Sequence, residues 1–468
     1  MFVYPYPLIP NPACYNHIVP KQYYIKTYGC QMNVNDSEIL AGILEREGYT
    51  PAEKMEEADL ILVNTCSIRA GAENKGLWFA HSIKSLKEKN PNLIIGLCGC
   101  VAQQEKETIL KKMPFVDLVM GPQGIDEFAG LLKEVANSST SLGVNSLQLT
   151  ASCFKEQTSA SRNLPAKRAK SSRAYVSITF GCDNYCSYCV VPYVRGREVS
   201  RSMDEILNEI KALDKTIHKE VILLGQNVNS WKVENRQLKI ENRLPELLRE
   251  VSAIAEVAWI NFMTSHPKDL SDDILAAMAE FPKVNHYLHL PVQSGSSKIL
   301  KAMNRKYDRE YYLKLIEKIY QKIPDITLTT DIIVGFPGET EADFEDSLSI
   351  IRQANFDSVN TLMFSPRPQT AAAQMTDQID EPTKNARLQK MMTVVENQSL
   401  AKNQLLVGKT LDVLVDGLAN NGRLAGRTRG NKIVYFDGSS DLQYQIVQVC
   451  INSAKSWGLE GGDGIDVG

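Results

Sequence analysis

Three closely spaced cysteines are the strongest chemical signal in this 468-residue sequence. Cys182, Cys186 and Cys189 follow the pattern C-x3-C-x2-C on a short loop, directly after the strand-like run 174–180. A structural zinc site uses four ligands in a closed tetrahedron, so this loop is one ligand short. Three thiolates can instead hold a 4Fe–4S cluster whose fourth iron stays open to a small molecule. We therefore predict such a cluster; a zinc-binding loop or three buried thiols are the alternatives.

A second set of cysteines is spread over the first third of the chain. Cys30, Cys66 and Cys100 each come at or just after the end of a strand-like run, and a helical pattern follows each run. Strands that alternate with helices predict a parallel sheet, and ligands gather outside the carboxyl ends of its strands. We expect these thiols to converge there and to hold a second cluster. The alternative is that each is a small apolar side chain filling a strand end.

The remaining cysteines have no setting that suggests chemistry. Cys98 should point away from Cys100, because successive strand residues face opposite sides of a sheet. Cys14, Cys153 and Cys450 are interpreted as structural. Ten cysteines in 468 residues do not imply a disulfide framework.

The sequence also bears on the compartment. The N-terminal run is broken by prolines and lacks the pattern of a signal peptide. No stretch approaches the eighteen apolar residues of a membrane-spanning helix. We expect a cytoplasmic protein without a membrane partner, in which cysteines bind metal or react rather than cross-link.

The pattern of expected strands and helices divides the chain into four parts. Residues 21–136 predict a flavodoxin-like α/β domain, and residues 173–404 contain six strand–helix units, typical of an open, partial (β/α)6 barrel. Residues 405–468 predict a small OB-like β-barrel. The serine-rich stretch 137–172 is interpreted as a flexible linker, and its basic run 167–170 is expected to be solvated.

Polar residues follow several barrel strands, where functional groups of such barrels gather. They are candidates for binding a polar cofactor: Gly225, Gln226, Asn227, Gln293, Ser294 and Asp331. The loop 335–340 belongs to the same group. Ordinary turns and helix N-caps explain these residues equally well, and the run from Thr340 does look like a helix start.

Basic residues offer two candidate contacts for RNA. The chain as a whole does not attract polyanions, since 52 Lys and Arg oppose 55 Asp and Glu. Arg427, Arg429 and Lys432 form a local patch, followed by aromatic residues that could stack on bases. Arg195 and Arg197 stand just after the cysteine loop. A solvated β-turn is the alternative for the first group.

These motifs together resemble the radical S-adenosylmethionine methylthiotransferases over nearly the whole chain. The matching runs are GCQMN at 29–33, NTCSIR at 64–69, GCVAQ at 99–103, YCVVPYVRG at 188–196, LGQNV at 224–228 and HLPVQSGS at 289–296. One motif departs from the family: its Tyr-Ser-x-Arg-x-Gly-Thr reads FSPRPQT at 364–370.

The resemblance implies a fold, cofactors and partners. It implies a cluster domain, a radical-SAM barrel and a C-terminal TRAM domain, in that order. The first cysteine set would hold a 4Fe–4S cluster that cleaves S-adenosylmethionine. The second set would hold a 4Fe–4S cluster that carries the sulfur. The partners would be a tRNA bearing N6-isopentenyladenosine, gripped by the TRAM domain, and a low-potential electron donor such as a flavodoxin or ferredoxin.

Two rival functions stay open at this point. The same chemistry could act on a threonylcarbamoyl adenosine or on an aspartate of a ribosomal protein. A protein of a different class, a non-catalytic zinc protein that binds RNA through its β-barrel, predicts zinc instead of iron and sulfide.

Overall fold

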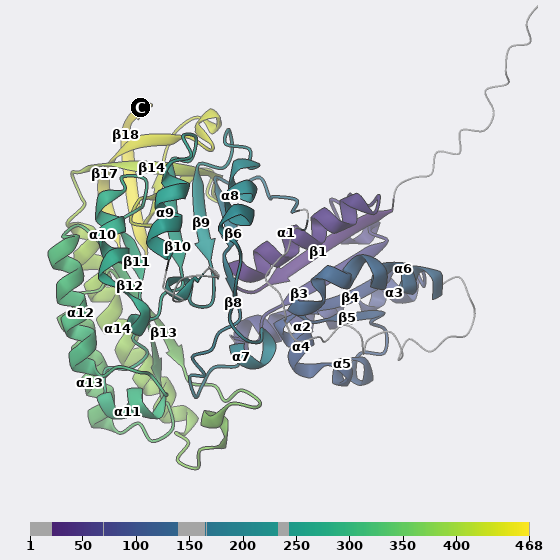
Figure 1. Ribbon diagram of the computed structural model, residues 1–468, viewed down its shortest axis with the longest axis horizontal. Helices are drawn as coiled ribbons and strands as arrows, with labels where there is room; N and C mark the ends of the chain where they lie inside the picture. Colours follow the sequence, from purple (N-terminus) through teal and green to yellow (C-terminus); the bar gives the residue numbers. More distant parts are fainter. Residues whose placement is uncertain (1–20, 69, 139–163, 165, 233–242, 468) are drawn as a thin grey trace, which may run out of the picture.

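The computed structural model describes residues 21–68, 70–138, 164, 166–232 and 243–467. Three bodies follow one another along the chain: an α/β domain, an open barrel and a small β-barrel (Figure 1). This order confirms the predicted fold class. In the described part of the chain, no helix has the length and apolar character needed to cross a lipid bilayer.

The N-terminal domain is a five-stranded parallel sheet with helices on both faces. Its strand order is β2-β1-β3-β4-β5. The strands are β1 (Gln22–Tyr28), β2 (Thr50–Pro51), β3 (Leu60–Thr65), β4 (Ile94–Gly99) and β5 (Leu118–Met120). The helices are α1 (Gln31–Arg46), α2 (Ala70–Ser82), α3 (Lys84–Lys89), α4 (Cys100–Glu105), α5 (Glu107–Lys112) and α6 (Phe128–Ser138). β3 and β4 are buried along their whole length, so separate apolar clusters pack on the two faces.

The sequence patterns predict helices over 37–47 and 103–112 in this domain, and both differ in the structure. α1 begins at Gln31 instead of 37, because Cys30 is its N-cap and the Asn33 side chain accepts a hydrogen bond from the Cys30 backbone. The helix predicted over 103–112 is divided into α4 and α5 at Lys106, whose φ of 46° is outside the helical range. The first change matters for function, because it places Cys30 at a helix N-terminus.

The middle domain is an open barrel of six parallel strands. The strands are β6 (Arg173–Ser177), β9 (Glu220–Leu224), β10 (Trp259–Met263), β11 (Tyr287–His289), β12 (Thr327–Val334) and β13 (Ser358–Met363). They form two sheets, β10-β9-β6 and β11-β12-β13, joined by a parallel bridge between Ile260 and Val284. β6 and β13 remain at the edges. The strand predicted over 175–180 ends earlier, because β7 (Thr179–Phe180) turns to pair with β8 (Val199–Ser200).

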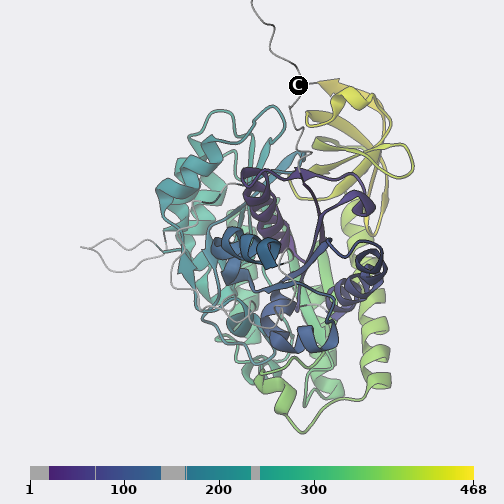
Figure 2. The ribbon, with the colours of Figure 1, turned by 90° about the vertical axis from the view of Figure 1, so that its right-hand side faces the viewer.

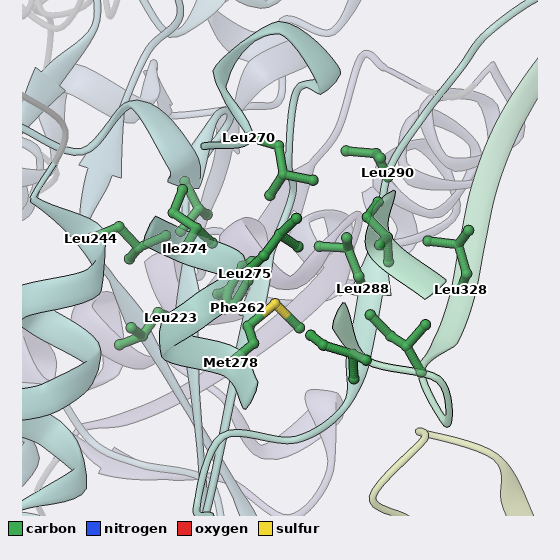
Figure 3. Close-up of a cluster of buried hydrophobic side chains, with 14 of the residues drawn as sticks. Leu223, Leu244, Phe262, Leu270, Ile274, Leu275, Met278, Leu288, Leu290 and Leu328 are labelled. Carbon is green, nitrogen blue, oxygen red and sulfur yellow. The ribbon is translucent and has the colours of Figure 1, made fainter. Parts of the chain in front are cut away.

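Helices cover the outside of the open barrel. They include α8 (Met203–Lys211), α9 (Leu244–Ser252), α10 (Asp272–Glu280), α11 (Ser297–Ala302), α12 (Arg309–Lys322) and α13 (Glu341–Ala354). Figure 3 shows the contact between strands and helices, where Phe262 and Leu288 pack against Met278 of α10. Because alternate strand residues face the other way, the polar side chains of His289, Thr329 and Asp331 lie inside the barrel, where His289 contacts both of the others.

The C-terminal domain is a closed five-stranded barrel reached through the long helix α14 (Glu381–Gln404). Its strand order is β14-β15-β16-β18-β17. The strands are β14 (Thr410–Leu418), β15 (Leu424–Thr428), β16 (Ile433–Phe436), β17 (Ile446–Lys455) and β18 (Gly458–Val467). Alternate residues such as Val413, Val415 and Phe436 fill its interior.

The prediction for the basic run 167–170 is wrong at Arg168. Its side chain is 11% exposed and forms an ion pair of 2.6 Å with Glu38 of α1. It also pairs with Glu209 of α8, so one guanidinium joins the first two domains. Most of the predicted linker lies outside the described residues.

Candidate active site

The loop that carries the first cysteine set follows the first barrel strand and is held at both ends. Gly181 has a φ of 71°, and a Cβ there would lie 2.0 Å from the backbone oxygen of Arg197. The Cys182 amide donates to the Gly196 oxygen over 3.2 Å, and the Ser187 amide donates to the Met303 oxygen over 3.0 Å. The loop therefore adopts its shape only because Gly181 has no side chain.

The thiols of this loop are half-buried and have few partners. Burial raises the pKa of Cys182 to about 11 and the pKa of Cys189 to about 12. The Arg305 guanidinium is 3.3 Å from the Cys186 sulfur and also donates to the Pro291 oxygen over 3.0 Å. Because these pKa values are raised, the thiolate form needs added positive charge at this site. The irons of a cluster would supply that charge. The residues present thus fit an iron–sulfur cluster.

Replacing Gly181 by alanine tests the loop geometry. Gly181→Ala should prevent iron from binding to this loop and cost at least about 2 kcal/mol, because alanine is strained at this φ and overlaps the Arg197 backbone. Iron analysis and thermal unfolding measure both effects. The matched control is Gly130→Ala in α6, where a Cβ meets nothing within 4 Å. That variant should keep its iron and gain a few tenths to about 1 kcal/mol; full iron loading of Gly181→Ala would contradict the account.

The second cysteine set converges as predicted. The Cys66 thiol is hydrogen-bonded to the sulfurs of both Cys30 and Cys100, so the three side chains share one site. Asn33 and Asn64 hold the strand ends together through a bond of 3.0 Å between their amides. Over the residues that the structure describes, no group of three His, Cys, Asp or Glu side chains suits a single metal ion.

The electrostatics favour thiolates at two of these positions. A hydrogen bond from Cys66 and the charge of Arg195 lower the pKa of Cys30 to about 6 and that of Cys100 to about 7. The same hydrogen bonds, with burial, raise the pKa of Cys66. Cys30 and Cys100 also stand at the N-termini of α1 and α4, where the helix dipole favours negative charge. Anionic sulfurs are the ligands that an iron–sulfur cluster requires.

Other cysteines stay apart from these sites. Cys98 packs in the apolar core between α1, α6 and the sheet, and burial raises the pKa of its thiol. Its sulfur is 3.7 Å from the Val63 oxygen, on the side of β4 away from Cys100. Cys450 lies in β17. Cys14 and Cys153 lie outside the described residues.

Both cysteine sets border one short helix, α7 (Val191–Val194). α7 begins two residues after Cys189, and Cys100 packs against Val190 and Val194 on its surface. At 1.5 Å per residue, the segment from Cys189 to Arg195 is about 9 Å long. The structure therefore brings the two sets close together across the interface between the first two domains.

Arg195 has a different role from the predicted contact with RNA. Its side chain is 3% exposed, and Nη2 lies 2.8 Å from Asp36 Oδ2 of α1. Its charge acts on Cys30 and Cys100 instead of on solvent. The prediction is wrong because a partner from the other domain encloses the guanidinium.

The N-terminal domain closes part of the open side of the barrel (Figure 1). α1 lies against β6: the Asn35 amide donates to the Tyr175 oxygen over 3.0 Å, and the Ser177 hydroxyl donates to Asn35 over 2.7 Å. Met32 packs with Phe180 and residues of β9. The divergent motif at 364–370 contributes a second link, because Arg367 pairs with Glu73 of α2.

Buried oxygens without a partner gather at the carboxyl ends of the barrel strands. Each of these oxygens belongs to a residue in β7 or in the loop after a barrel strand. None of them has a hydrogen-bond partner within the described part of the chain. They are Thr179 Oγ1, Gln226 Oε1, Asn227 Oδ1, Ser265 Oγ and Gln293 Oε1. Leaving such groups unpaired costs free energy, so they fit a polar cofactor at the barrel mouth. Thr179 and Ser265 were not predicted, since single hydroxyls at strand ends form no motif.

Other predicted cofactor residues are placed differently. Ser294 is fully buried, lies 3.4 Å from the Ser347 hydroxyl of α13 and accepts from the Ser296 amide, so its hydroxyl contacts the helix layer. A Cβ at Gly225 would be 2.0 Å from Thr179 Oγ1, so this glycine permits a close approach. Asp331 lies inside the barrel, where it accepts from Asn360 over 2.8 Å.

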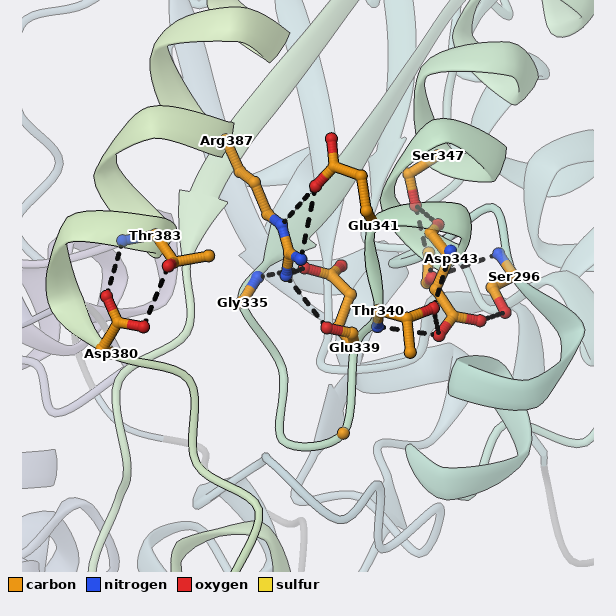
Figure 4. A network of polar contacts seen from close by, with 12 residues as sticks. Ser296, Gly335, Glu339, Thr340, Glu341, Asp343, Ser347, Asp380, Thr383 and Arg387 are labelled. Atoms are coloured by element: carbon orange, nitrogen blue, oxygen red, sulfur yellow. Dashed lines mark hydrogen bonds and ion pairs between the residues drawn. The ribbon is translucent and has the colours of Figure 1, made fainter.

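The loop 335–340 is an ordinary helix start. Glu339 accepts from the Gly335 amide over 2.7 Å and from Arg387 of α14 over 2.9 Å (Figure 4). Thr340 and Asp343 form the capping box of α13. The alternative explanation of this loop is therefore the correct one.

The predicted RNA patch in the last domain is instead the turn that caps the barrel. The turn 428–432 meets the amino ends of the barrel strands, where Arg429 donates to the Pro282 oxygen over 2.8 Å and stacks over Trp259. Lys432 pairs with Asp357 over 2.9 Å. Arg427 is largely enclosed. The patch is therefore partly enclosed by the barrel: the Lys432 side chain is 13% exposed, whereas that of Arg429 is 42% exposed.

Arg197 is the one predicted RNA residue with a largely exposed side chain. It is 72% exposed and pairs with Asp183 of the cysteine loop over 2.7 Å. Its position beside the first cysteine set leaves it open to a bound polyanion.

Glu220 at the capped end of the barrel predicts a pH dependence. Burial raises its pKa to about 7, and the Asn285 amide donates to it over 3.2 Å. The folded state then binds a proton that the unfolded chain releases above about pH 4.5, so stability falls from about pH 5 to 7 and levels off above. Glu220→Gln should flatten this slope and stabilise the protein at pH 7.5. Urea unfolding at several pH values measures how the free energy of unfolding changes with pH. The same pH dependence in Glu220→Gln as in the wild type would contradict the prediction.

The sequence matches three families in the order expected. Residues 22–121 match "Uncharacterized protein family UPF0004", residues 176–351 match the radical SAM superfamily, and residues 404–462 match the TRAM domain. Among solved structures, the radical S-adenosylmethionine methyltransferase TsrM from Kitasatospora setae is similar, with a TM-score of 0.55, 12% identity and coverage of 76% of this chain and 77% of TsrM. This likeness concerns the fold.

Curated relatives are similar over almost their whole length, and the three described next carry the name tRNA-2-methylthio-N(6)-dimethylallyladenosine synthase. The protein of Thermoanaerobacter sp. (strain X514) is 44% identical over 94% of this chain and 92% of its own. That of Carboxydothermus hydrogenoformans is 44% identical, covering 94% and 99%, and that of Clostridium botulinum (strain Okra / Type B1) is 46% identical, covering 94% and 96%. With its two cysteine sets in place, the chain belongs to the tRNA-2-methylthio-N(6)-dimethylallyladenosine synthase family of radical S-adenosylmethionine enzymes.

Proposed function

We propose that this enzyme adds a methylthio group to C2 of N6-isopentenyladenosine next to the anticodon of tRNA. Two 4Fe–4S clusters and S-adenosylmethionine are the cofactors of the proposal. The observation that carries it is that one three-cysteine set directly precedes α7 in the chain, while Cys100 of the other set packs against Val190 and Val194 of the same segment. A radical enzyme that inserts sulfur needs a cluster for each task, and this arrangement supplies both next to one barrel mouth.

Each set has its own task in the proposal. Cys182, Cys186 and Cys189 would hold the cluster that supplies one electron to cleave S-adenosylmethionine into methionine and a 5′-deoxyadenosyl radical, and Cys30, Cys66 and Cys100 would hold the sulfur-carrying cluster. Gln226, Asn227 and Gln293, with Thr179 and Ser265, offer buried oxygens to S-adenosylmethionine. Met32, Phe180 and Leu224 form an apolar contact that keeps water away from the barrel mouth.

The protein's own residues also set the protonation of the site. Arg195 and the two helix N-termini keep Cys30 and Cys100 anionic before a cluster is assembled. Arg305 donates an N–H to the Cys186 sulfur and so stabilises added electron density there. The two arginines thus serve different clusters.

The partners follow from the same proposal. The substrate is a tRNA bearing N6-isopentenyladenosine, whose target base must leave its stack to reach the barrel mouth. Electrons come from a low-potential donor such as a flavodoxin or ferredoxin, in the cytoplasm. The names of the relatives favour an isopentenyl group over a threonylcarbamoyl adenosine or a ribosomal aspartate as acceptor.

Mass spectrometry of the RNA tests the proposal. Reconstituted enzyme, S-adenosylmethionine, sulfide and a chemical reductant are incubated with three matched tRNAs: unmodified, isopentenylated and threonylcarbamoylated. We expect a methylthio group only on the isopentenylated tRNA. Product on the threonylcarbamoylated tRNA alone, or on none of them, would overturn the proposed substrate.

A further inference from the structure

A polar cavity of about 280 Å³ lies between the TRAM barrel and the open edge of the radical barrel. Residues of β11, β12 and β13 form one wall, and the turns around 430–433 and 456–458 form the other. β13 is an edge strand, and its Ser358 and Asn360 are exposed. Figure 2 shows the TRAM barrel above the end of α14. The cavity thus opens at the unpaired edge of the barrel.

The charges of the lining favour an anionic ligand. Arg427 and Lys432 face a single carboxylate, Asp357. Lys432 at 2.9 Å and Lys402 at 3.7 Å both lie beside that carboxylate, so cations outnumber carboxylates around the cavity. A divalent cation would need several free oxygens and finds one paired carboxylate. Apolar side chains are few in the lining, which contains Tyr287, Ile433 and Trp457 among mostly polar residues.

One aromatic side chain at the rim distinguishes this cavity from a simple phosphate site. Trp457 is 59% exposed, although large apolar side chains are usually covered. Tyr435 supports its ring from the edge at 5.7 Å between centroids, and Lys455 lies 5.3 Å from its centre. Its indole N–H makes no hydrogen bond to a described residue. An exposed, supported indole beside cations is a stacking surface for a nucleobase.

We propose that this cavity holds one unpaired nucleotide of the bound tRNA, other than the nucleotide that is modified. Its base would stack on Trp457, and its phosphate would lie near Arg427 and Lys432. The volume suits one nucleotide and is too small for a helical segment of RNA. This inference rests on the proposed function, because it presumes an RNA substrate. It assigns the grip of the TRAM domain to the cavity rim around Trp457, together with Arg427 and with Lys432 of the turn 428–432.

Binding of a labelled anticodon stem-loop with isopentenyladenosine to the cluster-loaded enzyme tests the inference. Trp457→Ala should weaken binding about tenfold, and Trp457→Phe should stay within about threefold of the wild type, because the loss reports stacking. The matched control is Trp78→Ala: Trp78 is 72% exposed on α2, away from the cavity, and its loss should change nothing. Binding of Trp457→Ala within twofold of the wild type would overturn the inference.

A second variant reaches the cavity from the other wall. Ser358→Trp fills the space from the edge strand without touching the TRAM core, so it should also weaken binding about tenfold even if Trp457→Ala fails to fold. Stem-loops that lack one base at a time identify the bound nucleotide. Removal of the base at one position other than the target should weaken binding to the wild-type enzyme about tenfold. The same removal should not weaken binding to Trp457→Ala any further. No such position, or full binding by Ser358→Trp, would contradict the cavity.

The outcome for the proposed function stays separate. The proposed function is tested with the wild-type enzyme alone, and the cavity is tested with the variants. If the wild type forms methylthio product and the variants bind RNA as well as the wild type, only the cavity is refuted. Absence of product from the wild type on every tRNA would refute the function, whatever the variants bind.

Discussion

Cys66→Ala should reduce the iron content from about eight to about four atoms per chain and abolish methylthio product. The reason is that Cys66 links the other two thiols of its set, so its loss removes the sulfur-carrying cluster. The loop with Cys182 is untouched, and the variant should still cleave S-adenosylmethionine to 5′-deoxyadenosine. Iron and sulfide analysis, with chromatography of the nucleosides, measures all three quantities.

Cys98→Ala is the matched control for this experiment. Cys98 is as buried as Cys66 and stands two residues from Cys100, yet it faces the apolar core. Its replacement should keep about eight irons and the full product yield. Loss of 5′-deoxyadenosine formation in Cys66→Ala, despite an intact first cluster, would contradict separate roles for the two sets.

Arg195→Ala should destabilise the enzyme by about 3–5 kcal/mol, because it leaves Asp36 charged and buried at the domain interface. The double variant Arg195→Met/Asp36→Leu should recover much of this loss, since it removes both charges. Unfolding by urea, followed by circular dichroism, measures the change. Apo protein should be used beside the reconstituted enzyme, so that cluster loss is not mistaken for weaker folding.

Arg197 supplies the control two residues away. It pairs with Asp183 at the surface and is 72% exposed, so solvent screens the interaction and Arg197→Ala should not change the unfolding midpoint measurably. Equal effects of the Arg195 and Arg197 variants would contradict the role of the buried pair in joining the domains.

The cysteine sites could be predicted from the sequence because their signals are local. Cys182, Cys186 and Cys189 share one loop, and Cys30 and Cys66 each follow a strand that alternating helices identify as parallel. Successive strands of one sheet bring such ends together without further information. The six barrel strands were predictable for the same reason, apart from the early end of β6.

The residues that sequence reasoning misplaced depend on distant partners. Arg195 reads as a solvent-facing charge until Asp36, 159 residues away, encloses it. Arg429 and Lys432 read as a surface patch because a charge run looks the same whether water or another domain covers it. Ser294 packs on α13 for a similar reason. Thr179 and Ser265 carry no pattern, and only their unpaired oxygens in the folded barrel reveal them.

The most direct test of the central claim uses tRNA with deuterium at C2 of N6-isopentenyladenosine. If the enzyme removes this atom with the radical formed beside Cys182, Cys186 and Cys189, one deuterium should appear in 5′-deoxyadenosine for each methylthio group formed. Mass spectrometry of both products gives the ratio. Methylthio product accompanied by 5′-deoxyadenosine without deuterium would contradict the proposed reaction.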